Sequence, residues 1–426
     1  MKLLIDLDAF FVSAERTRNP RLNGIPVAVG GRGDQHIFSQ EATRQHISLE
    51  NSGAFVPSIM LEPASSPGAK GIDYFTDDNG KVRGILTTAS YEARALGVKT
   101  PMPIAQALSI CPSLVILTPS FSLYHDFSKR LRAFLEKRIP VLEQFSIDEF
   151  FCDLDGWIED ADIPSFIHNL KEEILEEFDL PVSIGAAQSK WIAKLASGQA
   201  KPFGTRVIWP QDHWEFIKNI PIEKFPGIGR RLQERFHLMQ FQTLGDIVHA
   251  KPYFDQQTPS MRLLYQKICG TDRDPVKPPK ERKSIGVSRT FDAVVSREEI
   301  KRRLTILCRD LAYTIIQAGV NPTQFHLYLR YELKGRAKGH VQTHRLFSEE
   351  LLRKEIMRLF QEIDQLKTYH LISISISTGG FSHQTKQALD MFMIDEDKKR
   401  QALSLSGAKI RKKYGLDMLR WGNEMA

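Results

Sequence analysis

Residues 1–11 read MKLLIDLDAFF, an apolar run that is interrupted by Asp6 and Asp8. Such a short run predicts a buried β-strand, and side chains two residues apart on a strand share one face. Residues 141–154 read VLEQFSIDEFFCDL, which predicts two strands joined as a hairpin with acidic residues near the turn. Because buried carboxylates need a compensating partner, these two stretches mark a candidate functional site.

The acids of the two stretches could share divalent metal ions. Asp148 and Glu149 lie near the predicted turn, and Asp6 on a neighbouring strand would complete a bridging set. Phosphoryl transfer to a sugar hydroxyl uses two metal ions about 3.5–4 Å apart that are bound by oxygen ligands, and strands hold such ligands more rigidly than loops. Spacing alone leaves two alternatives open: each acid caps a turn or pairs with an arginine, or the site belongs to a nuclease or a nucleotide cyclase.

The chain has 426 residues, which is enough for two to four domains at about 100–200 residues each. Hydrophobic residues make up 42% and charged residues 26%, values typical of globular proteins, which argues against a wholly disordered or fibrous chain. The net charge of +7 suits a polyanionic partner. Between Val276 and Leu346 there are 15 Lys and Arg against 6 Asp and Glu, so the basic excess is concentrated in this segment.

The cysteines are scattered and form no CxxC pair, so neither a zinc site nor a disulfide framework is expected; they are Cys111, Cys152, Cys269 and Cys308. A reducing, cytoplasmic location fits this pattern. Two aspartates interrupt the only candidate signal-peptide stretch, and no run approaches the roughly 20 apolar residues of a membrane span. No membrane association is therefore expected.

The pattern along the chain is mixed α and β. Residues 31–83 are rich in Gly, Pro, Ser and Asp and are interpreted as loops. A Pro-Gly-Ile-Gly turn at 226–229 joins two helical segments, and the Pro- and charge-rich segment 277–283 predicts a domain boundary. Beyond this boundary, hydrophobic periodicity predicts a βαββαβ domain with a hairpin turn at 334–339; its elements fall at 284–291, 297–318, 323–332, 340–347, 349–366 and 370–378.

Four motifs occur in order along the chain: DLDAFF at 6–11, SYEAR at 90–94, SIDE at 146–149 and AKPFG at 200–204. With these motifs the chain resembles a Y-family DNA polymerase, and within that family it is most similar to the DNA polymerase IV subfamily. The similarity covers residues 1–30 and 84–415, which is most of the chain.

The resemblance implies an α+β, multidomain, right-hand polymerase fold. The expected parts are a ferredoxin-like palm (1–10 and 121–208), small fingers (11–120), a helical thumb with a helix-hairpin-helix motif (209–275), a linker (276–283), the βαββαβ little finger (284–380) and a C-terminal tail with a clamp-binding-like motif (381–426).

The resemblance also implies a catalytic metal triad of Asp6, Asp148 and Glu149, with the backbone carbonyl of Leu7 as a further ligand. These groups would bind two Mg²⁺ ions per active site, and Mn²⁺ could substitute. Asp8 is expected to support the strand instead of binding metal.

Five further residues are expected to contact the incoming nucleotide. Phe11 matches the family's steric gate, a ring that would collide with a ribose 2′-hydroxyl, whereas the preceding Phe10 is expected in the core beside the nucleotide site. Tyr91 and Arg94 match a triphosphate-binding pair, and Lys201 matches a phosphate-binding lysine. Fixed cations of this kind stabilise charge on phosphate oxygens during transfer.

Primer-template DNA is the expected macromolecular partner. Gly227 and Gly229 match the helix-hairpin-helix motif, in which backbone N–H groups at a helix start contact phosphates without reading sequence. The basic side chains expected to contact the DNA backbone are Arg282, Lys283, Arg289, Arg330, Lys334 and Arg336. A charged, solvated surface is the alternative for this last group.

The segment from Gln387 to Phe392 resembles the family's sliding-clamp peptide, which places a glutamine and apolar side chains in a groove of the ring. Gln387, Leu389, Met391 and Phe392 would make the contact, with Met391 standing where leucine is usual. The chain is otherwise expected to act as a monomer.

Residues 31–83 depart from the family, in which only a short connection is expected at this place. This insertion is expected to be a solvent-exposed loop; the alternative is a flap that touches the template, suggested by Phe38, Phe55, Tyr74 and Phe75. The AVGGRG stretch lacks the Lys-Ser/Thr of a phosphate-binding loop and is discounted.

The resemblance implies low-fidelity synthesis past damaged template, in which dNMP is added to a primer 3′-OH without proofreading by an exonuclease domain. Two rivals remain: a catalytically silent relative that serves as an adaptor in a repair complex, and a metal-dependent nuclease.

Overall fold

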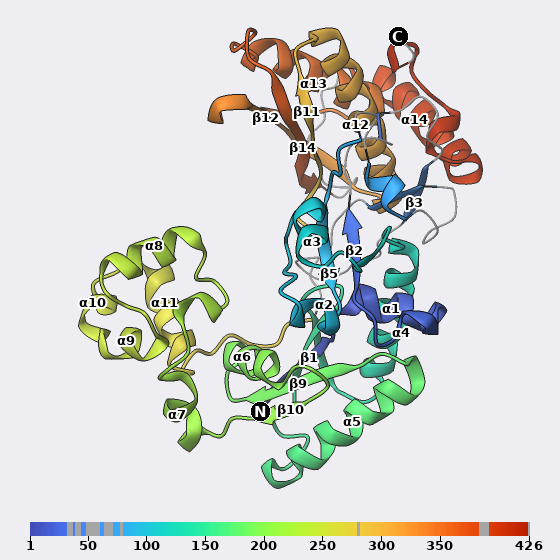
Figure 1. Ribbon diagram of the computed structural model, residues 1–426. Helices are drawn as coiled ribbons and strands as arrows, with labels where there is room; N and C mark the ends of the chain where they lie inside the picture. Colours follow the sequence, from blue (N-terminus) through green and yellow to red (C-terminus); the bar gives the residue numbers. More distant parts are fainter. Residues whose placement is uncertain are drawn as a thin grey trace.

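The computed structural model describes residues 1–31, 37–38, 44–47, 60–63, 71–76, 80–278, 282–382 and 392–424. Figure 1 shows four parts: a palm at the base, fingers above it, a thumb to one side, and a little finger at the top. The predicted α+β, multidomain right-hand architecture is confirmed.

The palm is built around a five-stranded sheet in the order β10-β9-β1-β8-β7. The N-terminal strand β1 lies in its centre and pairs antiparallel with both β8 and β9, so the predicted buried strand and the predicted hairpin β7–β8 are both present. The strands are β1 (Lys2–Leu7), β7 (Val141–Gln144), β8 (Glu149–Asp153), β9 (Val182–Ala187) and β10 (Thr205–Val207).

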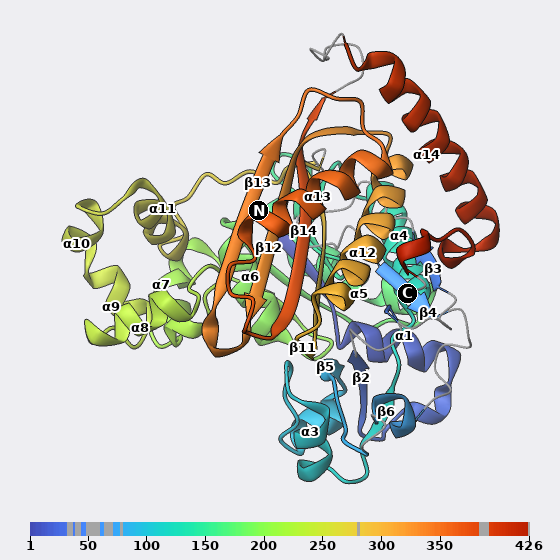
Figure 2. The ribbon, with the colours of Figure 1, turned by 90° about the horizontal axis from the view of Figure 1, so that it is seen from above.

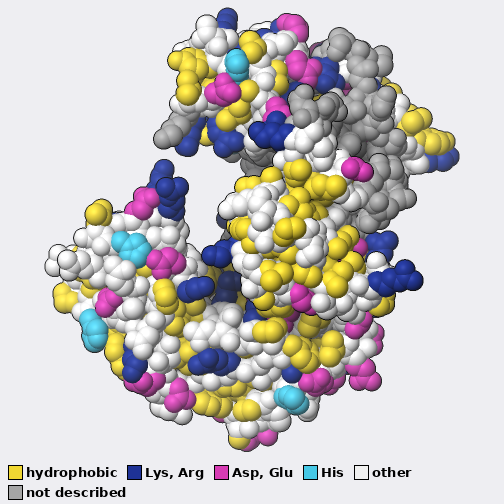
Figure 3. Space-filling model, in the orientation of Figure 1, with side chains coloured by type: hydrophobic (Ala, Val, Ile, Leu, Met, Phe, Trp, Pro, Cys, Tyr) yellow, Lys and Arg dark blue, Asp and Glu magenta, His cyan; other side chains and the backbone are white. Residues whose placement is uncertain are grey.

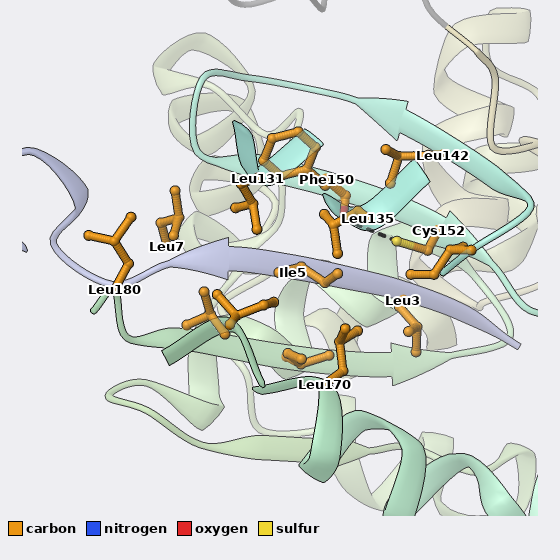
Figure 4. Packing of buried hydrophobic residues seen from close by; sticks show 14 of the residues in the cluster. Leu3, Ile5, Leu7, Leu131, Leu135, Leu142, Phe150, Cys152, Leu170 and Leu180 are labelled. Atoms are coloured by element: carbon orange, nitrogen blue, oxygen red, sulfur yellow. Dashed lines mark hydrogen bonds between the residues drawn. The ribbon is translucent and has the colours of Figure 1, made fainter. Parts of the chain in front are cut away.

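Alternation along β1 separates two cores. Leu3 and Ile5 pack with helices α4 (Phe121–Glu136) and α5 (Ile163–Phe178) on one face of the sheet, as Figure 4 shows. Leu4 packs on the other face, against helix α6 (Lys190–Ala200), in a core that continues into the thumb. Because Asp6 has the same parity as Leu4, its carboxylate lies on the α6 face.

The fingers carry a three-stranded sheet in the order β5-β2-β6. Its strands are β2 (Val27–Gly31), β5 (Ile85–Ala89) and β6 (Val115–Leu117), and its helices are α1 (Phe10–Arg18), α2 (Tyr91–Ala95) and α3 (Ile104–Ile110), with short 3₁₀ helices η1 (Pro20–Leu22) and η2 (Ile72–Phe75). Part of the insertion forms a hairpin of β3 (Arg44–Ile47) and β4 (Met60–Pro63) that was not predicted. Phe55 lies outside the described residues.

The described part of the insertion is not the solvent-exposed loop that we expected. Phe75 is fully buried in the core of the fingers, with Tyr74 packed beside it. Phe38 is buried in the core of the little finger. Aromatic side chains supply enough apolar area to dock a segment of low periodicity, which explains why the composition of this stretch was misleading.

The thumb is helical and joins the palm through a shared core. Its helices are α7 (His213–Ile217), α8 (Arg230–Leu238), α9 (Leu244–His249), α10 (Lys251–Asp255) and α11 (Pro259–Ile268), with η4 (Pro210–Asp212) and η5 (Ile222–Lys224). The following segment returns along the palm: the Trp191 indole donates a hydrogen bond to Asp274 (3.2 Å), and the backbone N–H of Lys277 donates to Glu143 (2.8 Å).

The little finger has the predicted βαββαβ order, with a sheet in the order β11-β14-β12-β13. Its elements are β11 (Ser284–Val294), α12 (Arg297–Ala318), β12 (Asn321–Tyr331), β13 (Arg336–Gln342), α13 (Glu349–Ile363) and β14 (Leu371–Ser382). The strand predicted at 340–347 begins earlier than expected, because the chain turns at η6 (Glu332–Lys334), where Leu333 has a left-handed φ of 55°.

The C-terminal residues pack on the helical side of the little finger instead of extending from it. Helix α14 (Ile394–Tyr414) is followed by η8 (Leu416–Met418) and η9 (Gly422–Glu424). Arg309 of α12, only 1% exposed, donates hydrogen bonds to Asp417 and Glu424, both at 2.6 Å. Figure 2 shows α14 on the side of the domain away from the thumb.

Among the described helices, none has the length and apolar composition that crossing a bilayer would require.

Candidate active site and nucleic-acid interface

The pairing of the palm strands brings the predicted acids together. Asp6 on β1 lies directly across from Glu149 on β8. The backbone N–H of Leu7 donates a hydrogen bond of 3.0 Å to the carbonyl of Asp148, so the turn between β7 and β8 is held against the end of β1. The three acids therefore meet although more than a hundred residues separate Asp6 from the other two.

The electrostatics of this site are those of crowded carboxylates. Burial, opposed by the positive charge of Lys201 and reinforced by the negative charges of Glu149 and Asp148, raises the pKa of Asp6 to about 7. A carboxyl with such a pKa is partly protonated at neutral pH. The cluster therefore needs positive charge to be fully ionised.

Lysines of α6 supply positive charge in a row along the sheet. Lys201, at the C-terminal end of the helix, places Nζ 2.7 Å from Asp6 Oδ1. About two turns earlier Lys194 forms an ion pair with Glu149, and about three turns earlier Lys190 forms one with Glu143 at 2.7 Å. The spacing of four and seven residues puts the three lysines on the helix face that meets the acids.

A glycine allows α6 to approach the sheet closely enough for these pairs. A Cβ atom at Gly185 on β9 would lie 2.1 Å from the carbonyl oxygen of Ala193 and 2.2 Å from the backbone nitrogen of Ser197. The backbone of the helix therefore rests directly on the backbone of the strand. The positions of Lys194 and Lys201 depend on this contact.

The donor set suits a hard divalent cation. In the described part of the chain, no group of three or more His, Cys, Asp or Glu side chains is already arranged as a metal site. The reason is visible in the ion pairs, because Asp6 and Glu149 are each turned toward a lysine. Three clustered carboxylates nevertheless provide the oxygen ligands and the excess negative charge that such a cation requires.

Asp8 connects the acids to the fingers. Its carboxylate accepts hydrogen bonds from the Tyr91 hydroxyl (3.0 Å), the Ser183 hydroxyl (2.8 Å) and the backbone N–H of Phe203 (2.7 Å). Its Oδ1 also lies 3.9 Å from Lys201 Nζ. With these partners the buried Asp8 is engaged in structural contacts, as its expected role requires.

The expected triphosphate-binding pair lies at the first turn of α2. Burial, followed by the charge of Asp8, raises the pKa of Tyr91, so its hydroxyl is a hydrogen-bond donor at neutral pH. The Arg94 guanidinium lies 4.8 Å from the centre of the Tyr91 ring, and its Nε donates to the carbonyl of Ala89 (2.9 Å). Tyr91 is thus fixed against Asp8, and Arg94 is fixed against Tyr91.

The two phenylalanines at the start of α1 differ in exposure. Phe10 is buried in the palm core, so only its backbone is left to line a nucleotide site. Phe11 is half-buried and stacks on Tyr124, with ring centres 4.3 Å apart and planes at 12°. Because Tyr124 is itself fixed by a hydrogen bond to Glu15 (2.7 Å), the Phe11 ring is held rigidly.

The thumb motif presents exposed backbone at a helix start. Gly227 has a φ of 99°, a conformation that favours glycine. Ile228 is buried and anchors the turn, while Gly227 and Gly229 remain exposed just before α8. The free N–H groups of the first helical turn are therefore accessible to an anion.

The outer face of the little-finger sheet is polar and basic. The strand register forms three rows across it, each running from β11 through β14 and β12 to β13: Gly286-Ser377-His326-His340, Ser288-Ser375-Tyr328-Lys338, and Thr290-Ser373-Arg330-Arg336. The residues of β11 and β14 on this face are small and mostly serine or threonine, whereas those of β12 and β13 are cationic or aromatic. This face, with the thumb, borders a hollow around which Lys and Arg side chains gather (Figure 3).

The other predicted DNA contacts are distributed less uniformly. By register Arg289 falls between Val287 and Phe291 on the helix-covered side of the sheet, so it is not part of the outer face. Arg282 is half-buried and Lys283 exposed. The side chain of Lys334 lies outside the described residues.

The predicted clamp-binding segment is mostly outside the described residues, which include neither Gln387, Leu389 nor Met391. Phe392, the last residue of the segment, is 91% exposed.

Sequence reasoning missed several groups of this site. Lys194 and Ser183 touch Glu149 and Asp8, and Ser146 hydrogen-bonds to Asp148. A signal was available for Lys194, because it lies seven residues before Lys201, an interval that puts two side chains on the same face of a helix. No pattern in the sequence marks Ser183 and Ser146 as partners of these acids.

Family models match three stretches of the chain. The impB/mucB/samB family matches residues 5–198, the C-terminal domain of that family matches residues 282–391, and the HHH motif of the IMS family matches residues 210–241. The three stretches correspond to the palm with the fingers, the little finger, and the thumb.

Curated relatives agree with these matches. DNA polymerase IV of Streptococcus pneumoniae serotype 2 is 30% identical over 333 residues, covering 77% of this chain and 82% of that protein. DNA polymerase IV 1 of Halalkalibacterium halodurans is 29% identical over 378 residues, covering 86% and 90%. Among solved structures, a Y-family DNA polymerase chimera of Dbh and Dpo4 has a TM-score of 0.68 at 22% identity, covering 89% of this chain and 98% of that one.

The fold is that of a right-hand polymerase with a palm, fingers, a thumb and a separate DNA-gripping domain. The chain belongs to the impB/mucB/samB family, the Y-family DNA polymerases. Enzymes of this family depend on divalent metal ions.

Proposed function

We propose that this chain extends a primer on damaged DNA template, adding dNMP from a dNTP to the 3′-OH without proofreading. The observation that carries the proposal is the continuous chain of contacts Glu149–Lys194, Asp6–Lys201 and Asp8–Tyr91, which joins palm and fingers at one site. The curated relatives are named DNA polymerase IV, and one solved relative is an insertion ternary complex of Dbh DNA polymerase.

In this proposal, Asp6, Asp148, Glu149 and the Leu7 carbonyl hold two Mg²⁺ ions. When bound, these ions lower the pKa of the attacking hydroxyl and stabilise charge on the leaving diphosphate. Lys201, which pairs with Asp6 in this structure, would supply a positive charge to a phosphate oxygen of the nucleotide.

Tyr91 and Arg94 bind the triphosphate from the fingers side. The Tyr91 hydroxyl donates a hydrogen bond, and Arg94 supplies a fixed charge. The Phe11 ring closes the floor of the site and rejects a ribose 2′-hydroxyl. The exposed start of α8 and the outer face of the little-finger sheet bind the phosphate backbone without reading sequence.

Primer extension with Mg²⁺ and dNTPs tests the proposal. The wild-type chain extends the primer, whereas the adaptor alternative predicts no change and the nuclease alternative predicts shortening. Asp148→Ala should reduce extension by at least about a hundredfold, since even outer-shell changes at metal sites cost 10–100-fold. Affinity for primer-template should persist in this variant.

The matched control is Asp153→Ala, which removes an acid from the far end of β8, the strand that follows Asp148, where Asp153 pairs with Lys2. This control should extend normally. Full extension by Asp148→Ala would refute the assignment of the metal-binding acids.

The clamp contact through Gln387, Leu389, Met391 and Phe392 is proposed on sequence grounds. The exposure of Phe392 supports it. Phe392→Ala should weaken binding to a sliding clamp in a pull-down while leaving clamp-free extension unchanged.

A further inference from the structure

The insertion in the fingers reaches across to another domain. Ile37 and Phe38 follow β2 of the fingers in sequence, yet both pack in the core of the little finger. Phe38 is 6% exposed, and its ring meets Phe291 of β11 edge to face, with centres 5.8 Å apart and planes at 88°. Such aromatic pairs contribute beyond the area they bury.

The little finger provides a built receptor for Phe38. The Arg303 guanidinium lies 4.6 Å from the centre of the Phe38 ring and 4.5 Å from that of Phe291. Arg302 Nη2 donates a hydrogen bond of 2.8 Å to the Phe38 carbonyl. Both arginines are oriented by Glu299, with Nε–Oε distances of 2.7 Å. The receptor therefore recognises both the side chain and the backbone of Phe38.

Two further contacts attach the same insertion. At its other end, Arg83 Nη1 lies 3.5 Å from Asp292 Oδ1, the residue that follows Phe291. Between the two ends, strand β3 lies against η8 of the C-terminal segment, and β4 lies against α4 of the palm. Figure 1 shows β3 between the fingers and the helical side of the little finger.

These contacts matter because the little finger is joined to the rest of the chain covalently only through the linker after the thumb. A domain on such a linker moves relative to its neighbours unless a sufficient interface holds it. The insertion adds a second attachment, on the side of the domain away from the outer sheet face. Phe38 points into the little-finger core and not toward the hollow, so the insertion holds the domain without obstructing DNA.

We propose that the insertion is an intramolecular strap that fixes the little finger against the fingers, with Phe38 as its positioning residue, and so sets the opening of the DNA-binding hollow before DNA arrives. The expected effect of the strap on DNA affinity rests on the proposed function. The expected effect on domain position does not.

The test measures the distance between spin labels on the fingers and on α14. Ile110→Cys and Leu403→Cys place labels at exposed positions, after the half-buried Cys269 is replaced by serine; the other cysteines are buried. The full-length chain should give a single narrow distance distribution by double electron–electron resonance. Phe38→Ala should broaden this distribution or shift it to longer distances.

The matched control is Ile72→Ala, which removes an apolar side chain of the same insertion that is 40% exposed; it should leave the distribution unchanged. Asp292→Lys is a second variant, which sets like charges against each other at Arg83 on the surface, where folding is not disturbed. It should broaden the distribution less than Phe38→Ala. An unchanged distribution in both variants would overturn the strap.

A second readout links the strap to synthesis. Phe38→Ala should weaken primer-template affinity by about tenfold, as follows if the arrangement that binds DNA falls to about a tenth of the population, while the insertion rate at saturating DNA stays near wild type. Broadened distances with unchanged affinity would retain the strap and reject its role in DNA binding. Absence of any extension in the wild-type chain would refute the proposed function alone.

Discussion

Phe11 is half-buried and stacks on Tyr124 at the start of α1, and we propose that its ring discriminates against a ribose sugar. Phe11→Val should increase incorporation of ribonucleotides relative to deoxynucleotides by at least about tenfold, because removing several carbon atoms from a packed pocket relieves a steric clash of that order. Single-nucleotide insertion with dCTP and CTP opposite template G measures this ratio.

Phe121→Val is the appropriate control for this change. Phe121 also packs edge to face on Tyr124, with ring centres 6.1 Å apart, so its loss disturbs the same aromatic group. It should leave sugar discrimination intact. If Phe11→Val discriminated as well as the wild type, Phe11 would be only a packing residue.

The raised pKa of Asp6 makes metal binding dependent on pH. The metal-free carboxyl has a pKa of about 7, because of burial and the neighbouring acids, and a metal ion must displace its proton. Affinity for Mg²⁺ should therefore rise by roughly tenfold per pH unit up to about pH 7 and level off above it. Calorimetric titration between pH 6 and pH 8 measures the slope and the proton release.

Asp6→Asn should remove that slope, because the amide does not titrate in this range. A wild-type affinity that is constant from pH 6 to pH 8 would contradict the raised pKa.

At the scale of single elements, helix α6 depends on its contact with strand β9. Gly185→Ala would place a Cβ atom 2.1 Å from the carbonyl oxygen of Ala193, so the helix must move. Overpacking of this kind costs about 1–3 kcal/mol or more, and we expect a lower melting temperature together with a lower insertion rate, since Lys194 and Lys201 move with the helix.

Gly198→Ala is a matched control on the same helix, because a Cβ atom there meets nothing within 4 Å. Alanine in a helix interior is favoured over glycine by about 1 kcal/mol, so this variant should melt at the same temperature or higher. Equal melting temperatures for Gly185→Ala and the wild type would disprove the close contact.

The elements differ in how far the sequence predicts them. Strand β1 and the β7–β8 hairpin were predictable because a short apolar run is typical of a strand that is buried on both faces. The βαββαβ order was predictable because burial on one face imposes a clear period on the side chains. The packing of helix α14 was not predicted, because this helix docks through ion pairs such as Arg411–Glu349 while Leu403 stays exposed. Contacts between charged side chains produce no hydrophobic periodicity in the sequence, so periodicity could not predict how this helix packs.

The residues of the candidate site also differ in how far the sequence predicts them. Motifs located Asp6, Asp148, Glu149, Tyr91 and Lys201, and the fold brings these residues close together. The partners of these residues depend on register and on helix placement, which local sequence does not encode. Phe38 was noted as an aromatic in a loop, but its receptor lies about 250 residues away in the chain.

At the scale of the whole molecule, the outer face of the little-finger sheet should dominate the salt dependence of DNA binding. Arg336→Ala and Lys338→Ala each remove an exposed cation from this face. Each should reduce the slope of log K against log salt by about 1 and weaken binding equally for all sequences. Fluorescence anisotropy with labelled primer-template at several salt concentrations measures the slope.

Lys409→Ala is the control, because Lys409 is equally exposed but lies on α14, on the opposite side of the domain. The slope of log K against log salt for Lys409→Ala should equal that of the wild type. If the three variants behaved alike, the basic face would not be the surface that meets the duplex.

The buried Arg309 affects when the little finger can finish folding during translation. Two of its carboxylate partners, Asp417 and Glu424, are translated 108 and 115 residues later. Burying an arginine without its counter-charges costs a large amount of free energy. Helix α12 therefore leaves the ribosome well before the C-terminal segment that covers it has been synthesised. The little finger must therefore stay incomplete on the nascent chain, and chaperones would meet an open helical surface at that stage.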